Sequence, residues 1–546
     1  MTTPGWTIAA YLYALGAAVA ARQPHIVFFL ADDYGFADIG YHADLYGRAN
    51  GTNKIRTPTL DQLSASGVRL ENYYIQPVCS PTRATLLTGR YVFHHGVHVP
   101  FIDSSRSTLP LNETTLAERM KSAGYATAAV GKWHLGFRTW AHTPTERGFD
   151  SFYGYYAGSQ DYYNKESLCW PGAVKNGCFE NTTADGLPVT ALDFHNNKAT
   201  ANSTTNETTE YSTTLYTQVA ANVINAHAAA YGESSPPDAS RVAMTKPLFL
   251  YLPYQAVHVG NIAELGHPYE TNEVPQRYID PYRWVENVQR RNLSGMVAAM
   301  DEAALNVTKT LRAAGMWKDT IFIFSTDNGG PENEMASNYP LRGGKGSLWE
   351  GGVRGVGFIA GGDLATFGFT RLPRVSRALM HVSDWNPTLC ELVGGCPLAP
   401  AAAFPLDGVS AAGLLKVGAN ESTTSNRTSI VHDLCLPWMG GSCLEHLAKV
   451  SEAPYPAAAM YASIAKSGWK LTIGQEKDPT FTPELYHIAA DPAEQHNVAQ
   501  SNAAKVAELL AELKRYEKGA GVAHDRDPID PRSNPHLHGG VWVPWE

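Results

Sequence analysis

Four short apolar runs, each followed by a polar or glycine-containing segment, constrain the fold of this chain more than any other feature. These runs cover residues 25–30, 126–130, 247–252 and 320–325. A continuous apolar run without polar alternation is typical of a strand buried on both faces of a parallel sheet. Helix-like segments lie between the runs, notably residues 114–123 and 293–315, and the second has apolar residues at helical spacing. Strands that alternate with helices predict an α/β fold with a large, mostly parallel or mixed sheet flanked by helices.

The chain has 546 residues, which is too many for one small core and leaves room for a second domain. Ala-Pro-rich sequence around residues 397–405 marks the expected boundary. Beyond it, residues 461–473 alternate loosely and predict one or two antiparallel strands, and residues 502–517 predict an amphipathic helix. We therefore expect a large α/β domain over residues 22–400 and a smaller C-terminal α+β domain over residues 401–546.

The N-terminus, residues 1–21, reads as a signal peptide. A moderately apolar run covers residues 6–21, and Ala18-Val19-Ala20 supplies an A-x-A cleavage pattern. No Lys or Arg precedes the run, so an uncleaved anchor or a buried helix stays open as an alternative. No later stretch approaches the roughly 20 apolar residues that a membrane span needs. We therefore expect entry into the secretory pathway and an extracellular or lysosome-like destination.

Nine N-x-[ST] sequons fit a secreted glycoprotein. They begin at Asn50, Asn112, Asn181, Asn202, Asn206, Asn292, Asn306, Asn420 and Asn426. The formal net charge is -9, and there is no run of five or more Lys and Arg residues. Nucleic acid is therefore an unsuitable partner for this chain.

The seven cysteines divide into three close pairs and one residue left over. The pairs are Cys169/Cys178, Cys390/Cys396 and Cys435/Cys443. Each could form a local disulfide in an oxidising compartment. The remaining Cys79 could be a free buried thiol, which is the usual state of a lone cysteine. The residues that follow Cys79 in the sequence favour a chemical role for it instead.

Residues 79–90 read CSPTRATLLTGR, and this pattern resembles the signature of type I sulfatases. The resemblance runs from about residue 24 to the C-terminus. Further matching blocks lie at residues 131–136, 341–345, 348–355 and 484–494. The final residues, 540–545, resemble arylsulfatase B-type members, which remove 4-sulfate from N-acetylgalactosamine in glycosaminoglycans.

The resemblance implies an alkaline-phosphatase-like fold and a modified Cys79. In this family a formylglycine-generating enzyme oxidises the cysteine to Cα-formylglycine, and Pro81 and Arg83 belong to the motif that it reads. The aldehyde hydrates to a geminal diol, so one hydroxyl can attack sulfur and the other can then expel sulfate. A serine or cysteine nucleophile would instead wait for water to hydrolyse its covalent intermediate.

Two pairs of polar residues follow two of the predicted strands. Asp32 and Asp33 come after the first run, and Asp327 and Asn328 come after the last. Ligands bind at the carboxyl ends of strands in open α/β sheets, and this oxygen-rich set favours Ca²⁺ or Mg²⁺ over zinc. An isolated Asp-Asp pair is more often a helix cap or turn. The resemblance implies one Ca²⁺ ion, with modified Cys79 as a further ligand.

Three basic residues occupy positions that match the family's sulfate-binding cations: Arg83, Lys132 and Lys345. A lone Lys or Arg is usually a solvated surface group, whereas sulfate ester cleavage needs fixed positive charge near the sulfate oxygens. The resemblance therefore implies that these cations bind the sulfate.

Proton transfer has its own candidates, also by resemblance. Arg83 would orient the diol, Asp327 would take a proton from the attacking hydroxyl, and His134 would be the base for the collapse step. His258 and Lys345 would protonate the leaving group. A lone histidine is more often structural, but an imidazole titrates in the range that acid–base catalysis requires.

The sequence thus predicts a sulfatase that hydrolyses sulfate monoesters, with aryl sulfates as test substrates and a sulfated carbohydrate as the natural one. Three alternatives stay open. The first is a formylglycine-dependent phosphonate or phosphodiester hydrolase, and the second is an inactive secreted glycan-binding relative. The third is a zinc-dependent phosphatase, which the oxygen-rich ligand set opposes.

Overall fold

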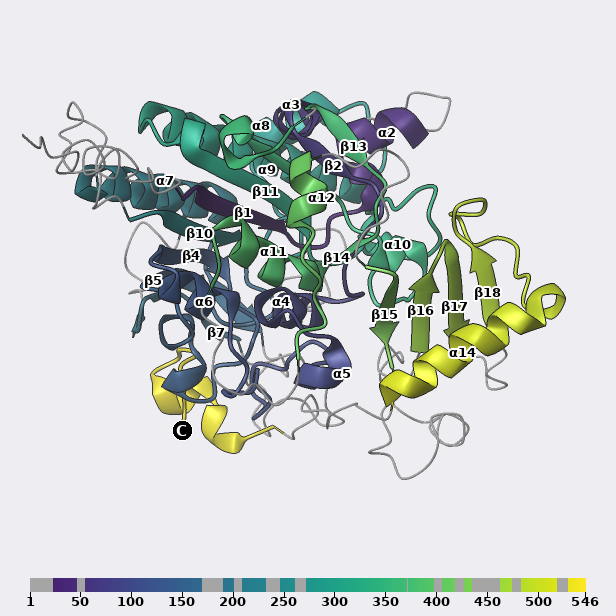
Figure 1. The fold of residues 1–546 in the computed structure, drawn as a ribbon. Helices are drawn as coiled ribbons and strands as arrows, with labels where there is room; N and C mark the ends of the chain where they lie inside the picture. Colours follow the sequence, from purple (N-terminus) through teal and green to yellow (C-terminus); the bar gives the residue numbers. More distant parts are fainter. Residues whose placement is uncertain are drawn as a thin grey trace, which may run out of the picture.

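The computed structural model consists of a large α/β domain with a small antiparallel sheet beside it (Figure 1). The described residues are 23–46, 55–168, 190–200, 209–231, 246–260, 272–370, 372–396, 405–417, 427–434, 462–473, 483–517 and 529–546. The proposed signal peptide and six of the sequons, at Asn50, Asn181, Asn202, Asn206, Asn420 and Asn426, lie outside these ranges. No helix among these residues is long and apolar enough to cross a membrane.

The main sheet has ten strands among the described residues, in the order β13-β2-β12-β11-β1-β10-β4-β5-β8-β9. Its strands are β13 (Arg374–Ser376), β2 (Val68–Leu70), β12 (Gly357–Gly361), β11 (Thr320–Thr326), β1 (His25–Ala31), β10 (Leu248–Pro253), β4 (Ala126–Lys132), β5 (Ser151–Tyr155), β8 (His195–Asn196) and β9 (Ala199–Thr200). The central five, β11 to β5, are parallel, and antiparallel pairs flank them. The prediction of a large mixed sheet is confirmed.

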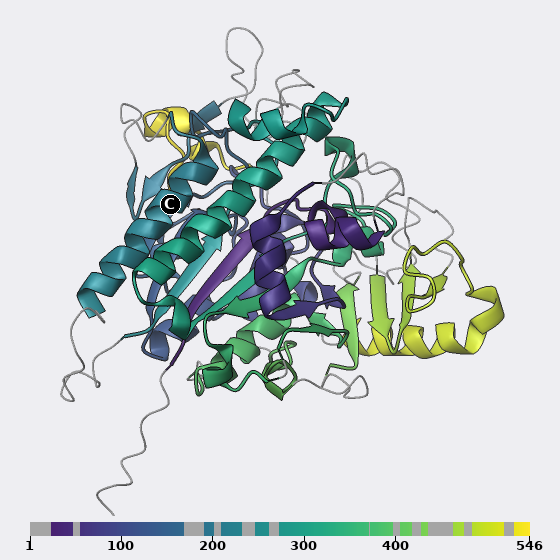
Figure 2. The ribbon, with the colours of Figure 1, turned by 90° about the horizontal axis from the view of Figure 1, so that it is seen from above.

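Strand β1 shows why the predicted strands are uniformly apolar. Val27 and Phe29 pack into the core on one face of the sheet, while Ile26 and Phe28 pack into the core on the other. Helices cover both faces, so every side chain of the strand needs an apolar environment. Figure 2 shows two long helices lying side by side across one face, α7 (Ser212–Tyr231) and α9 (Val288–Ala313).

Helices on the opposite face carry part of the site described below. They are α4 (Cys79–Thr88), α6 (Leu116–Ser122), α11 (Trp385–Leu392) and α12 (Ala412–Val417). Short elements complete the domain: α2 (Gly40–Tyr46), α3 (Pro58–Ser66), β3 (Tyr73–Tyr74), α5 (Val92–His95), β6 (Glu166–Leu168), β7 (Thr190–Leu192), α8 (Gln276–Ile279), α10 (Glu350–Val353) and β14 (Met380–His381). Helices α6 and α9 lie where the sequence predicts them.

The small sheet has four antiparallel strands in the order β15-β16-β17-β18. These are β15 (Ser429–Asp433), β16 (Ala462–Lys466), β17 (Trp469–Ile473) and β18 (Glu484–His487), and α14 (Ala503–Glu517) packs along one face (Figure 1). The predicted hairpin and helix are both present. The domain limits at residues 22–400 and 401–546 stay predictions. The last stretch, 529–546, returns to the large domain, where Trp542 is buried in its core.

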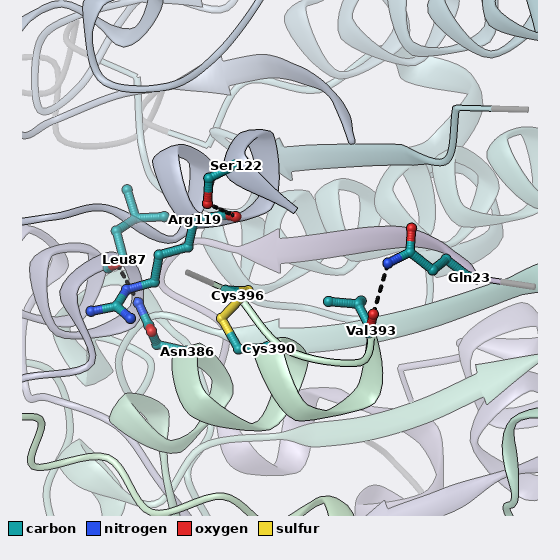
Figure 3. Close-up of a disulfide and its surroundings, with 8 residues drawn as sticks. All are labelled: Gln23, Leu87, Arg119, Ser122, Asn386, Cys390, Val393 and Cys396. Carbon is teal, nitrogen blue, oxygen red and sulfur yellow. Dashed lines mark hydrogen bonds between the residues drawn. A yellow bond between two sulfur atoms is a disulfide. The ribbon is translucent and has the colours of Figure 1, made fainter. Parts of the chain in front are cut away.

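The predicted disulfide between Cys390 and Cys396 is formed (Figure 3). It lies at the end of α11, beside Val393, whose carbonyl oxygen accepts a hydrogen bond from Gln23 Nε2 at 2.7 Å. Cys79 is a buried free thiol. The other two predicted pairs, Cys169/Cys178 and Cys435/Cys443, lie outside the described residues.

Candidate active site

The pairing of β1 with β11 brings the two acidic motifs together. These strands are parallel and Ala31 is in register with Thr326, so both chains leave the sheet at the same edge. The backbone amide of Asp33 donates a hydrogen bond to Asp327 Oδ1 at 3.2 Å. Asp32, Asp33, Asp327 and Asn328 are almost completely buried. The site therefore concentrates three carboxylates where the low dielectric makes unpaired charge costly.

Helix α4 begins at Cys79 and supplies two further side chains to this edge. Arg83 lies one turn after Cys79, so both project from the same side of the helix. Arg83 Nη2 lies 3.0 Å from Asp32 Oδ2 and 2.9 Å from Asp327 Oδ2. Cys79 Sγ lies 3.7 Å from Asp32 Oδ1. A buried guanidinium between two carboxylates fixes the helix against both strand ends.

Two lysines complete the charge balance of the site. Lys132 is the last residue of β4, and its Nζ lies 2.5 Å from Asp32 Oδ2. Lys345 Nζ lies 2.7 Å from Asp33 Oδ2. With Arg83, these cations match the three carboxylates in number. A divalent metal ion would therefore make the site positive overall, which favours an anionic ligand.

The two histidines are held by backbone carbonyl oxygens. His134 Nε2 lies 3.2 Å from Phe101 O, and its Nδ1 is buried without a partner among the described residues. His258 Nδ1 lies 2.9 Å from Val259 O, while its Nε2 lies 3.5 Å from Asp33 Oδ2. A carbonyl oxygen can only accept a hydrogen bond, so the ring nitrogen that faces it must carry a proton. In a neutral ring the opposite nitrogen then has a free lone pair.

Burial and neighbouring charges shift the pKa values of several of these groups. Burial raises the pKa of Asp327, and Asp32 beside it adds to the rise. Burial alone would also raise the pKa of Asp32, but Lys132 and Arg83 hold it below its usual range. Burial raises the pKa of the Cys79 thiol to about 12. Burial and Lys345 together lower the pKa of His258 to about 4.

The backbone is strained at two of these positions. Asp33 has φ 56° and His134 has φ 53°, a left-handed conformation that non-glycine residues adopt less readily. Such conformations persist where the surroundings determine them and cluster at functional sites. Two of the seven non-glycine residues with positive φ in the described part of the chain thus belong to this group of side chains.

The residues present fit a hard divalent cation. Ligand atoms of Asp32, Asp33, Cys79 and His258 all lie within 4.8 Å of one another. Only the two carboxylates of this group are hard oxygen donors, since sulfur and imidazole nitrogen are ligands that zinc also takes. Asn328 Oδ1 is buried with no hydrogen-bond partner in the described part of the chain, while its amide nitrogen donates to Asp33 Oδ1 at 2.7 Å. An unsatisfied buried oxygen beside carboxylates is a donor that a metal ion would use. Oxygen donors of this kind favour Ca²⁺ or Mg²⁺.

The structure thus brings together all of the site residues predicted from the sequence: Asp32, Asp33, Cys79, Arg83, Lys132, His134, His258, Asp327, Asn328 and Lys345. It also shows supporting residues that were not predicted. Ser80 Oγ donates to His134 O at 2.9 Å and accepts from Phe101 N at 3.1 Å. Tyr162 Oη donates to His258 O at 2.8 Å. Neither contact has a local sequence signal, because the partners are distant along the chain.

Comparison with known proteins shows the family to which the chain belongs. The sulfatase family model matches residues 24–395. Arylsulfatase J of Mus musculus is 35% identical over 555 residues, covering 96% of this chain and 80% of that protein. Arylsulfatase A of Homo sapiens is 29% identical, covering 93% and 89%. The solved structure of Ps i-CgsB in complex with k-i-k-neocarrahexaose has a TM-score of 0.68 at 23% identity, covers 95% of this chain and 98% of its own, and shows the shared fold. The chain therefore belongs to the sulfatase family of sulfuric ester hydrolases.

Proposed function

We propose that the protein hydrolyses sulfate monoesters with a formylglycine made from Cys79 and one Ca²⁺ ion held by Asp32, Asp33, Asp327 and Asn328. One observation carries this proposal. Cys79 and Arg83 lie on one buried helix, and that helix is fixed by ion pairs against carboxylates at the ends of β1 and β11. A formylglycine-generating enzyme is the maturation partner that this proposal requires.

The two absent groups would supply complementary chemistry. The hydrated aldehyde would provide two hydroxyls on the former Cβ of Cys79, and the cation would neutralise negative charge beside them. Sγ of the unmodified cysteine occupies the place of an oxygen on that carbon. Because the thiol is buried and its pKa is raised, unmodified sulfur is a weak nucleophile. This supports a modified rather than a native cysteine.

The fixed cations would bind the sulfate group. Arg83 and Lys132 are fully buried and Lys345 is mostly buried, so little reorganisation is needed when an anion arrives. Positively charged donors held in a water-poor site stabilise charge on the transferring group far better than they would in water. Arg83, beside both Cys79 and Asp32, would also hold the hydroxyls in position.

Proton transfer would be divided between the two sides of the site. Asp327, whose Oδ2 lies 2.9 Å from Arg83 Nη2 at the end of β11, would accept the proton of the attacking hydroxyl. His134 would accept a proton at Nδ1, which is free because Nε2 donates to Phe101 O. The side chains of His258 and Lys345 are 14% and 21% exposed, more than the other site residues. They therefore lie toward solvent, where an alcohol would leave and would need a proton. Lys345 Nζ carries protons that it could donate, whereas His258 would have to be protonated at Nε2 before it could act as the acid.

The natural substrate that we propose is a sulfated carbohydrate. The solved structure of Ps i-CgsB, which shares the fold, is a complex with k-i-k-neocarrahexaose, and this is our ground for proposing a carbohydrate here. The proposed compartment is the secretory pathway. Asn112 and Asn306, two of the described sequon asparagines, are exposed and could carry glycans.

A direct comparison of leaving groups tests the proposed function. Protein made in a secretory host would be assayed with 4-nitrophenyl sulfate, 4-nitrophenyl phosphate, a phosphodiester and a phenylphosphonate, with Cys79→Ala as the control. We expect the sulfate ester to have the highest kcat/KM and the Cys79→Ala variant to be inactive. A higher kcat/KM for the phosphonate or diester would favour the alternative hydrolase, and no turnover of any ester would favour an inactive relative.

A further inference from the structure

The small C-terminal sheet contributes a buried cation to the loop that carries Lys345. Lys470, on β17, is fully buried, and its Nζ lies 3.0 Å from Glu350 Oε1 and 3.0 Å from Glu494 Oε1. Glu350 ends the loop of residues 342–350, here called the Lys345 segment, and begins α10. The segment is therefore joined to the small domain by an ion triad that water does not reach.

Glu494 holds both ends of the Lys345 segment. Its carboxylate accepts a hydrogen bond from the backbone amide of Glu350 at 2.6 Å and so caps α10. The indole of Trp349, at the N-cap position, has no acceptor with which to do this. The backbone carbonyl of Glu494 accepts from Arg342 Nη1 at 3.3 Å. One residue of the C-terminal domain thus fixes the distance between the two ends of the loop.

Apolar packing reinforces the same contact. The guanidinium of Arg342 stacks 3.6 Å from the centre of the Trp349 ring. That ring meets the edge of Tyr486, on β18, at a centroid distance of 5.6 Å. Trp349 and Tyr486 form a small buried cluster with Ile488. The C-terminal domain therefore contacts the segment through both ion pairs and apolar packing.

The other side of the segment meets the chain that leads into Cys79. Gly346 N donates to Pro77 O at 2.8 Å, and Tyr74 Oη donates to Glu350 Oε2 at 3.0 Å. Lys345 itself stands between Gly344 and Gly346, and Gly346 has φ +84°. A glycine-rich stretch has little intrinsic preference for one conformation. The position of Lys345 Nζ therefore depends on the contacts of the segment, which are the anchors at its ends and local bonds such as that from Lys345 N to Gly330 O at 3.4 Å.

We propose that Glu494 and Lys470 are positioning residues that hold Lys345 in place, and that the C-terminal sheet domain is thereby part of the catalytic apparatus. The inference rests on the proposed role of Lys345 in sulfate binding. Removing one partner of a buried ion pair leaves an unpaired buried charge and lowers stability. Because this triad also anchors the Lys345 segment, its loss should lower turnover as well as stability.

A double-mutant cycle tests this inference. Glu494→Gln would be measured in the native chain and in a Lys345→Ala background, with kcat and KM for 4-nitrophenyl sulfate. If Glu494 acts through Lys345, we expect kcat/KM to fall about ten-fold in the native chain and less than about two-fold in the second background, because coupled residues are not additive. Arg342→Met leaves the triad intact but removes the other anchor of the segment. It should also lower kcat/KM more in the native chain than in the Lys345→Ala background, and it replaces Glu494→Gln as the test if that variant does not fold.

Lys466→Met is the matched control, since Lys466 forms an ion pair with Glu512 inside the C-terminal domain. It should lower the melting temperature and leave kcat/KM unchanged. Equal losses in both backgrounds, or the same loss of kcat/KM in the control, would overturn the inference and leave the proposed function standing. An inactive native protein, or an undiminished Lys345→Ala variant, would instead refute the proposed function or the proposed role of Lys345.

Discussion

Replacing Lys132 by methionine tests the electrostatic account of the site in a single step. Lys132 and Asp32 are fully buried, and their charged atoms lie 2.5 Å apart. At an effective dielectric constant of 20, unit charges at that distance attract by about 7 kcal/mol. Most of this attraction offsets the desolvation of the two ions. When the lysine is removed, the desolvated carboxylate stays behind, and such losses cost about 3–5 kcal/mol.

Arg83 still contacts Asp32 in this variant, so the cost should fall near the lower end of that range. Urea denaturation followed by tryptophan fluorescence would measure it. The same variant removes a fixed cation from the proposed sulfate site, and losses of that kind lower kcat by about 10²–10³. Initial rates with an aryl sulfate would measure this second effect.

Lys121→Met is the control for the same chemical change at the surface. Its Nζ lies 2.8 Å from Asp150 Oδ1, but both side chains are substantially exposed, at 49% and 38%. Exposed pairs contribute about 0–1 kcal/mol, so stability should change little and kcat not at all. If Lys132→Met behaved like this control in both assays, the buried charge balance described here would be wrong.

Three further predictions concern the metal, a buried carboxyl pair and the disulfide. Chelation should lower the melting temperature, and Ca²⁺ at about 100 times its Kd should restore about 2.7 kcal/mol, measured by thermal unfolding; an unchanged melting temperature would oppose a resident cation. Burial and the neighbouring Asp161 raise the pKa of Glu273 to about 8, so its contribution to stability is fully present below the unfolded pKa and is lost as the pH rises through 8. Glu273→Gln should therefore become more stable relative to the native protein between pH 5 and 9, as judged by melting temperatures, and a constant difference would contradict this. Cys390→Ser should cost about 2 kcal/mol in urea unfolding, the loop-closure value for so short a loop; no loss would argue against the bridge.

The central strands could be predicted because burial on both faces leaves an unbroken apolar signature. Strands β2 and β13 could not, because each spans three residues and includes an arginine. Helix α7 was also missed, since its alanines and threonines give only a weak apolar face. The sequence therefore predicts the central strands of the sheet but not the short strands β2 and β13 at its edge.

The convergence of the candidate site residues could be predicted for a related reason. Its residues sit in short motifs directly after strands, and the parallel pairing of β1 with β11 brings those motifs together. The contact between Lys470 and Glu350 was not predictable. A lysine in an alternating strand normally faces solvent, and these two residues are 120 positions apart. Only the packing of the C-terminal sheet against the loop makes Lys470 a buried ion.

The most direct test of the account is the mass of the tryptic peptide that contains Cys79, from protein made in its native secretory pathway and shown to release sulfate. Conversion of cysteine to formylglycine lowers that mass by about 18 Da. We predict this lower mass in the active material and its absence from Cys79→Ala. Active protein in which every copy of the peptide keeps an unmodified thiol would show that modified Cys79 does not carry the reaction.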